Sequence, residues 1–238
     1  GLLLTRKKTE RQLSKHSETI LQAHSEGIMN LDKIKIADPE DIMNLVKSGG
    51  AKILQKKSEE YLIISKEFLA SLKACHVDGM PKNTEIRHIL KLEAARSSKL
   101  VTAFKQQRSV LESESSLIIT MRLFYGDSSS NLNRIFLEGF NSEILNSIKE
   151  DYAKKSKPLA YGHGYYFSRY ASKVHHFNES CGKVILANVS VGNIKTVVKP
   201  VSGDLKTKFG KQFDTLLCPG RLIPNNNEKR SMEEYITL

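Results

Sequence analysis

Apolar residues recur at helical spacing in the stretch that begins at Ser58. In SEEYLIISKEFLASL, residues 58–72, Leu62 and Leu69 are seven positions apart, and Phe68 and Leu72 are four apart. Ser58 stands before this pattern as an N-cap candidate, and two glutamates follow it in the first turn. The pattern therefore predicts a helix over residues 58–72.

The next two patterns predict a strand and a second helix. NTEIRHILKL, residues 83–92, is rich enough in β-branched side chains for a strand. Leu100, Phe104 and Leu111 then recur at spacings of four and seven, which is typical of a helix.

Strand patterns dominate the second half of the chain. We expect strands in LIITMRLFYG (117–126) and EEYITL (233–238), and two more in KVILANVSVGNIKTVV (183–198) around a Gly192-Asn193 turn. SSSNLNRIFLEGF (128–140) predicts a short helix that has serine caps and stops at Gly139. The sequence thus favours an α+β fold in which helices precede a mostly antiparallel sheet.

The first 57 residues differ from the rest. They are polar and basic, and turn-forming sequences interrupt their helix-like stretches at DPED (38–41) and KSGGAK (47–52). We interpret residues 1–57 as a leader with a limited core of its own, and residues 58–238 as one domain. The basic run at residues 6–8 fits a solvated surface better than an import signal or a phosphate-binding tag. Because the chain stops inside an expected strand, we also expect it to be part of a longer protein.

The net charge and the cysteine content narrow the possible partners and the cellular compartment. A formal net charge of +11 favours an anionic partner, which could be nucleic acid, an acidic protein or a phosphate-bearing ligand. Three cysteines, Cys75, Cys181 and Cys218, without CxxC spacing indicate neither a disulfide framework nor a zinc ribbon, and they fit the reducing nucleus or cytosol. No apolar run approaches the length of a signal peptide core or a membrane helix.

The densest candidate site is AYGHGYYFSRYASKVHHF, residues 160–177. Two glycines let the backbone approach a ligand, and the aromatic side chains around them offer faces on which a planar ring could stack. The simpler alternative is a strand that leads into a helix, with aromatic residues alternating between core and edge. Zinc binding by His163, His175, His176 and Cys181 is a third interpretation, although this spacing matches no familiar ligand set.

Several separated motifs occur in an order that resembles the catalytic domain of the poly(ADP-ribose) polymerase family. They are LFYG (123–126), GF (139–140), YGHGYYFSRYASKVHHF (161–177), GKVILANVSVGN (182–193), FDTLL (213–217) and EEYI (233–236). Within that family, residues 51–72, 84–92 and 189–204 look most like the plant radical-induced-cell-death-like group. The resemblance implies an ADP-ribosyltransferase fold with flanking helices.

The resemblance also implies a chemistry and its residues. Family members cleave the bond between nicotinamide and ribose of NAD+ and pass ADP-ribose to a protein side chain, using a histidine, a tyrosine and a glutamate. Here Tyr125 replaces the histidine, which in the family positions ribose and nicotinamide, and Gly126 matches the glycine that bonds the carboxamide. Tyr166 matches the stacking tyrosine, and Glu234 matches the catalytic glutamate, although neighbouring Glu233 leaves the register open by one residue.

Two further positions complete the implied nicotinamide pocket. Phe177 matches the second stacking aromatic residue, whereas Val174 replaces a serine that bonds the carboxamide in the family. Without that hydroxyl, one polar end of nicotinamide would be unpaired at a cost of about 1–3 kcal/mol. No metal is implied.

These departures lead to three hypotheses. The first is an ADP-ribosyltransferase-fold domain with weak or lost activity. We expect such a domain to act in plant stress and transcriptional regulation, in the nucleus or also in the cytoplasm, and to bind transcription factors through a region absent from this chain. The second is an active mono-ADP-ribosyltransferase that uses NAD+, and the third is a basic nucleic-acid-binding module. No membrane partner is expected.

Overall fold

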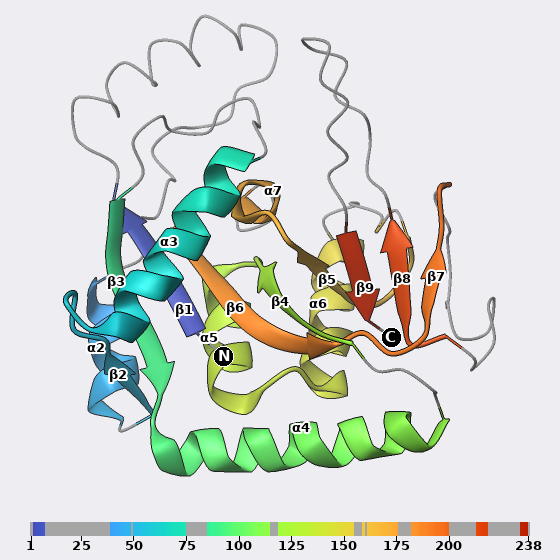
Figure 1. Ribbon diagram of the computed structural model, residues 1–238, viewed down its shortest axis with the longest axis horizontal. Helices are drawn as coiled ribbons and strands as arrows, with labels where there is room; N and C mark the ends of the chain where they lie inside the picture. Colours follow the sequence, from blue (N-terminus) through green and yellow to red (C-terminus); the bar gives the residue numbers. More distant parts are fainter. Residues whose placement is uncertain are drawn as a thin grey trace, which may run out of the picture.

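A nine-stranded sheet forms the centre of the computed structural model, in the order β2-β3-β1-β6-β4-β5-β9-β8-β7 (Figure 1). The structure describes residues 2–7, 39–48, 50–74, 85–114, 119–154, 159, 161–175, 182–199, 213–218 and 234–237. The strands are β1 (Leu2–Lys7), β2 (Ala51–Ile53), β3 (Glu85–Leu92), β4 (Thr120–Tyr125), β5 (Tyr165–Ser168), β6 (Lys183–Ser190), β7 (Ile194–Thr196), β8 (Thr215–Cys218) and β9 (Glu234–Thr237). Only the β7–β8 pair is parallel among these strands, so the mixed, mostly antiparallel α+β fold expected from the sequence is confirmed.

Helices cover both faces of this sheet. They are α2 (Pro39–Lys47), α3 (Glu59–Ala74), α4 (Ala94–Glu114), α5 (Ser129–Glu138), α6 (Ser142–Lys154) and α7 (Ala171–His175). In Figure 1, α3 and α7 lie in front of the sheet and α5 and α6 lie behind it. We had expected the helices to precede the sheet. Instead, α5, α6 and α7 fall between strands in the sequence.

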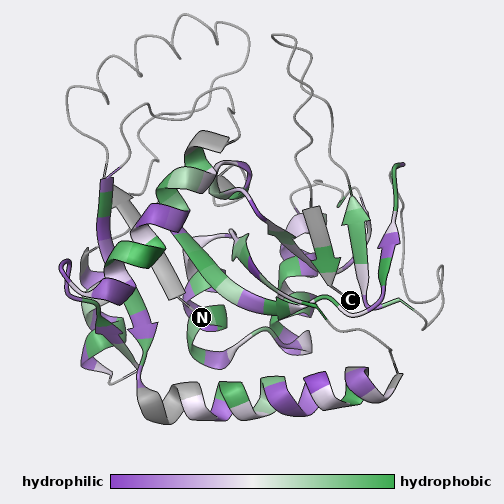
Figure 2. Cartoon of the chain, viewed as in Figure 1, coloured by the Kyte–Doolittle hydropathy of each residue, from purple (hydrophilic) through white to green (hydrophobic). Residues whose placement is uncertain are grey.

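Strand alternation divides the core between the two faces. Leu123 and Tyr125 of β4 pack with α5 and α6, whereas Phe124 between them packs with α3 and α7. Figure 2 shows β6 as one of the most apolar strands, in keeping with its burial between neighbours on both sides. The same figure shows polar and apolar residues mixed along α4, and most of its described side chains are exposed.

Local signals in the sequence explain the bounds of α5. The Ser128 side chain accepts a hydrogen bond from the Asn131 backbone N–H, which makes it the N-cap. At the other end, Gly139 has φ 83° and donates its N–H to the Ile135 carbonyl. A Cβ at this glycine would lie 2.9 Å from a Leu100 methyl carbon, so both the backbone and the packing favour glycine there.

Three elements come from the predicted leader. β1 lies between β3 and β6 and pairs with both, and α2 and β2 contribute the buried residues Leu45 and Ala51 to the core behind the sheet. These parts of residues 1–57 therefore belong to the same sheet and core as the domain that follows, in contrast to the leader that we expected. Arg6 and Lys7 of the basic run belong to β1, while residue 8 lies outside the described residues.

The strands around the Gly192-Asn193 turn also differ from a simple hairpin. Both β6 and β7 form where the sequence predicts strands, but they do not pair with each other, and four strands separate them in the sheet. Instead β7 pairs with β8, and the Asp214 side chain accepts a hydrogen bond from the Asn193 backbone at 2.9 Å. A turn sequence predicts a change of direction but not the partner of the next strand.

Candidate active site

Three of the residues implied by the family resemblance lie on neighbouring strands. In the register between β4 and β5, Tyr125 is opposite Phe167, so continuing it by one residue places Gly126 opposite Tyr166. In the register between β5 and β9, Tyr166 is opposite Ile236, and Ser168 is opposite Glu234. Tyr166 and position 234 are therefore one strand and two residues apart, about 8 Å between Cα atoms. The fold brings Gly126, Tyr166 and position 234 into one region of the sheet.

Tyr125 lies in the core behind the sheet. Its side chain is 4% exposed, and its ring makes edge contacts with Phe140 and Tyr165 and a tilted contact with Phe167. The nearest of these ring centroids is 5.3 Å away. Because Tyr166 alternates with Tyr165 and Phe167 along β5, the Tyr125 ring is on the opposite face of the sheet from Tyr166.

A carboxylate receives the Tyr125 hydroxyl. Tyr125 Oη donates to Asp127 Oδ2 at 2.8 Å, and Asp127 Oδ1 accepts from the Ser128 backbone at 2.6 Å and from Asn131 Nδ2 at 3.0 Å. Asp127 and Asn131 are themselves buried. This polar network joins the end of β4 to the first turn of α5. The sequence did not predict the roles of Asp127 and Asn131, which flank the N-cap Ser128.

Burial and Asp127 both disfavour ionisation of Tyr125. Burial first, and then the negative charge and hydrogen bond of Asp127, hold the pKa of Tyr125 well above its usual value. Tyr165 donates its hydroxyl to the Asn141 carbonyl at 2.6 Å, and burial raises the pKa of Tyr165 to about 12. Both tyrosines are therefore neutral hydrogen-bond donors at physiological pH, and Tyr125 is not poised for acid–base chemistry.

Tyr166 is held against the loop before β5. Its hydroxyl donates to the Gly162 carbonyl at 2.7 Å and accepts from the Tyr161 backbone N–H at 3.1 Å. The half-buried ring packs against a small core of Val197, Leu216, Cys218 and Ile236 from β7, β8, β9 and their flanks. Gly162 has φ 77°, a conformation that favours glycine, so this loop geometry depends on that residue.

The remaining candidates fall into two groups. Val174 is 3% exposed and packs beside Phe68 and Phe124 in the core under α3, so it offers no polar group. Phe177 lies outside the described residues, as do His176 and Cys181, and only the backbone of His175 is described. Within the described part of the chain, no three His, Cys, Asp or Glu residues gather as metal ligands. β5 leads into α7, so the strand and the helix of the simpler interpretation are confirmed.

Position 234 is defined by its backbone. Glu234 begins β9 and pairs with Ser168 of β5 and Cys218 of β8. Ser168 and Cys218 are both buried, and β9 lies between β5 and β8, so it is an internal strand of the sheet and not an edge strand. An internal strand gives a residue at this position a fixed backbone, which a catalytic carboxylate requires.

A comparison with models of known families identifies the family of this chain. A family model described as the poly(ADP-ribose) polymerase catalytic domain matches residues 58–231, which is more than half of the chain and stops just before Glu234. A search of curated proteins finds no match. None of the helices in the described ranges combines the length and apolar character needed to cross a membrane. From its motifs, its fold and this match, the chain belongs to the poly(ADP-ribose) polymerase catalytic-domain family.

Proposed function

We propose that this chain is an ADP-ribosyltransferase-fold domain whose transferase activity is weak or absent. The observation that carries the proposal is the position of Tyr125, which is buried behind the sheet with its hydroxyl on Asp127. By resemblance, the residue at this position holds the ribose and nicotinamide of NAD+. A side chain on the far face of the sheet cannot do so without leaving an aromatic core.

NAD+, the substrate of the family, fits the residues of this chain only in part. Gly126 is buried at the end of β4, one strand away from Tyr166, which supports a backbone partner and an aromatic partner for nicotinamide. The polar partners are not, because Tyr125 is turned away and Val174 has no hydroxyl. Losing both contacts costs about 2–5 kcal/mol of binding, which is roughly 1.5 to 3.5 decades of affinity. We therefore derive no reaction step through NAD+.

Calorimetric and thermal-shift titrations with NAD+ test this proposal. A ligand that binds the folded state raises the melting temperature in proportion to the logarithm of its concentration over Kd. We expect millimolar NAD+ to produce little or no increase and no saturable heat. A saturable response with a micromolar Kd would contradict the proposal.

An active mono-ADP-ribosyltransferase is the second candidate. It is supported by the neighbouring strands that carry Gly126, Tyr166 and position 234, since these are the groups closest to the chemistry in the family. This candidate requires release of nicotinamide from NAD+, detectable by chromatography, and loss of that release in Glu234→Gln. Absence of release in the unaltered protein would remove it.

The biological setting is also a proposal. The resemblance of residues 51–72, 84–92 and 189–204 to the plant stress-signalling group supports a regulatory role in the nucleus, with transcription factors as partners. A domain that keeps its fold after losing polar groups from its site is suited to such a role. The basic nucleic-acid-binding alternative is supported by the net charge of +11 alone.

A further inference from the structure

β3 contains a bulge where it pairs with the end of β1. In this pairing Arg87, between Ile86 and His88, has no opposite residue on β1 and is therefore an extra residue of β3. Ile86 and Ile89 both belong to the core under α3. Because side chains alternate between the two faces of a strand, the neighbour of each isoleucine points to the other face. The bulge thus brings Arg87 and His88 to the same face of the sheet.

Two lysines are held beside this part of β3. The chain after β2 continues alongside β3, since the Leu54 N–H donates to the Ile89 carbonyl at 2.9 Å. It then forms a turn with Lys56 and Lys57 at its centre. Ser58 closes the turn by donating both its N–H and its hydroxyl to the carbonyl three residues earlier, at 2.9 and 2.8 Å. Hydrogen bonds therefore fix the backbone of two exposed lysines next to the bulge.

The pKa of His88 reports how close these groups are. Burial first, and then the positive charges of Arg87 and Lys56, lower the pKa of His88. A like charge has this effect on a histidine at short range, so a guanidinium and an ammonium group lie near the imidazole. We define the basic cluster as Lys56, Lys57, Arg87 and His88.

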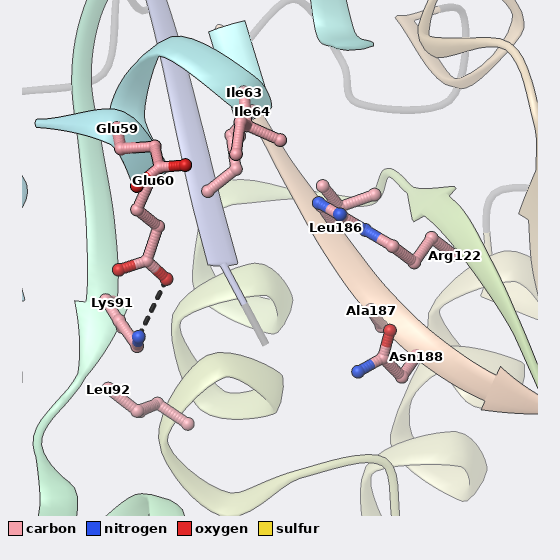
Figure 3. A pocket seen from close by; sticks show the side chains of 10 residues that line it. All are labelled: Glu59, Glu60, Ile63, Ile64, Lys91, Leu92, Arg122, Leu186, Ala187 and Asn188. Carbon is pink, nitrogen blue, oxygen red and sulfur yellow. Dashed lines mark hydrogen bonds and ion pairs between the residues drawn. The ribbon is translucent and has the colours of Figure 1, made fainter.

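The arginine of the basic cluster differs from others in the described chain. Ion pairs with glutamates at 2.8 to 3.8 Å neutralise three of them, Arg108, Arg122 and Arg134. On β3 itself, Lys91 Nζ bonds Glu60 Oε1 at 2.7 Å (Figure 3). Within the described ranges no carboxylate forms an ion pair with Arg87, although this residue is half-buried. Since a guanidinium stays charged at any physiological pH, an external anion would complete its contacts.

Nearby acidic residues limit the kind of anion that fits. Glu85 lies two residues before Arg87, opposite Lys7 of β1, and Glu59 begins α3 just after the turn. A nucleic acid carries a phosphate about every 3.4 Å along each strand, so the phosphates on either side of the bound one would meet these carboxylates. A single phosphate monoester avoids them. It offers about −1.5 to −2 charges at pH 7 and three acceptor oxygens to the basic cluster.

We propose that the basic cluster binds one phosphate monoester carried by a phosphorylated segment of a partner protein. The planar guanidinium of Arg87 donates to two phosphate oxygens, and Lys56 and Lys57 add positive charge. Because β2 ends the described sheet on this side, a polypeptide reaches the basic cluster along the edge of the sheet. Four strand spacings, about 19 Å, separate β3 from β5, so this site is independent of the nicotinamide region.

Titration with a phosphopeptide tests the site. The probe is an acetylated and amidated pentapeptide with phosphoserine at its centre and glycine elsewhere, added to millimolar concentration while the amide signals of the protein are followed by two-dimensional NMR. We expect saturable shifts at the basic cluster with this peptide and none with its unphosphorylated form. Inorganic phosphate identifies the source of the group. Weaker binding of inorganic phosphate supports a phosphorylated segment, whereas equal binding supports the phosphate site with free phosphate as its ligand.

Matched variants separate the basic cluster from the net charge of the protein. Arg87→Gln should weaken phosphopeptide binding by about tenfold or more, because it removes charge-assisted hydrogen bonds. Arg87→Lys keeps the charge but not the guanidinium fork, so it should restore only part of the affinity. Arg108→Gln is the control, since it removes the same charge from a half-buried arginine on α4, and it should bind as the unaltered protein does. Thermal melts confirm that each variant is folded.

Three results would overturn the proposal. They are no saturable shift at millimolar phosphopeptide, equal binding of the unphosphorylated peptide, and equal effects of Arg87→Gln and Arg108→Gln. A short single-stranded oligonucleotide that bound the same residues more tightly than the phosphopeptide, with an affinity that falls steeply as salt is added, would also overturn it and make nucleic acid the partner.

Discussion

Replacing Tyr125 by phenylalanine isolates the hydrogen bond that holds this residue behind the sheet. The substitution keeps the ring among Phe140, Tyr165 and Phe167 and removes only the hydroxyl at 2.8 Å from Asp127. A hydrogen bond to a charged group contributes about 1.5–3 kcal/mol, and the acceptor here is buried. We therefore expect the free energy of unfolding to fall by about 1.5–3 kcal/mol. For a chain of this size the melting temperature should fall by about 3–12 °C.

Urea denaturation followed by circular dichroism measures this loss, and Tyr165→Phe is its matched control. Tyr165 is also buried, but its hydroxyl bonds only neutral backbone groups of Asn141, donating to the carbonyl at 2.6 Å and accepting from the N–H at 3.2 Å. Two neutral bonds contribute about 1–3 kcal/mol together, so Tyr125→Phe should be the more destabilising of the two for each bond lost. If Tyr125→Phe cost less than half as much as Tyr165→Phe, the assignment of Tyr125 to a carboxylate-bonded structural role would be wrong.

Three further predictions concern the same region. The free energy of unfolding should fall above about pH 10, because the raised pKa values of Tyr125 and Tyr165 keep both side chains protonated in the folded state while the unfolded chain ionises. The slope is up to about 1.4 kcal/mol per pH unit for each tyrosine. Urea denaturation at a series of pH values checks this, and Tyr165→Phe should show a smaller slope. Gly139→Ala should lower the free energy of unfolding by about 1–3 kcal/mol, since φ is 83° and the new Cβ would crowd Leu100; a melting temperature equal to that of the unaltered protein would refute this. Ser128→Ala removes the N-cap of α5 and should cost about 0.5–2 kcal/mol in urea denaturation, whereas Ser128→Asp, which restores a capping acceptor, should recover most of the loss.

Local patterns in the sequence predicted much of the fold. The helix over 58–72 corresponds to α3, and the strands over 83–92 and 117–126 correspond to β3 and β4. Ser128 and Gly139 mark α5 because caps act within one or two turns of the backbone. β1 was not predicted as part of the sheet, since its pairing with β3 and β6 joins residues that are far apart in the sequence. Such pairings leave no short-range signal.

The sequence was less informative about the site. Motif order placed Gly126, Tyr166 and Glu234 on three strands, and the register shows that these strands are neighbours. The sequence identified the replacement of the family histidine by Tyr125 but not the direction of the Tyr125 side chain. That direction depends on the pleat of β4 and on the aromatic cluster behind the sheet. The hydrogen bond from the Tyr125 hydroxyl to Asp127 fixes that direction, and motif matching does not predict such a contact between side chains.

The most direct test of the central claim is transfer of labelled ADP-ribose from NAD+ to protein. Unaltered protein and Glu234→Gln are incubated side by side with NAD+ labelled in its adenylate part, and incorporated label is measured after denaturing electrophoresis. If the burial of Tyr125 weakens or abolishes the binding of NAD+, both proteins should show faint label or none. Strong label in the unaltered protein that disappears in Glu234→Gln would contradict the claim and establish an active transferase.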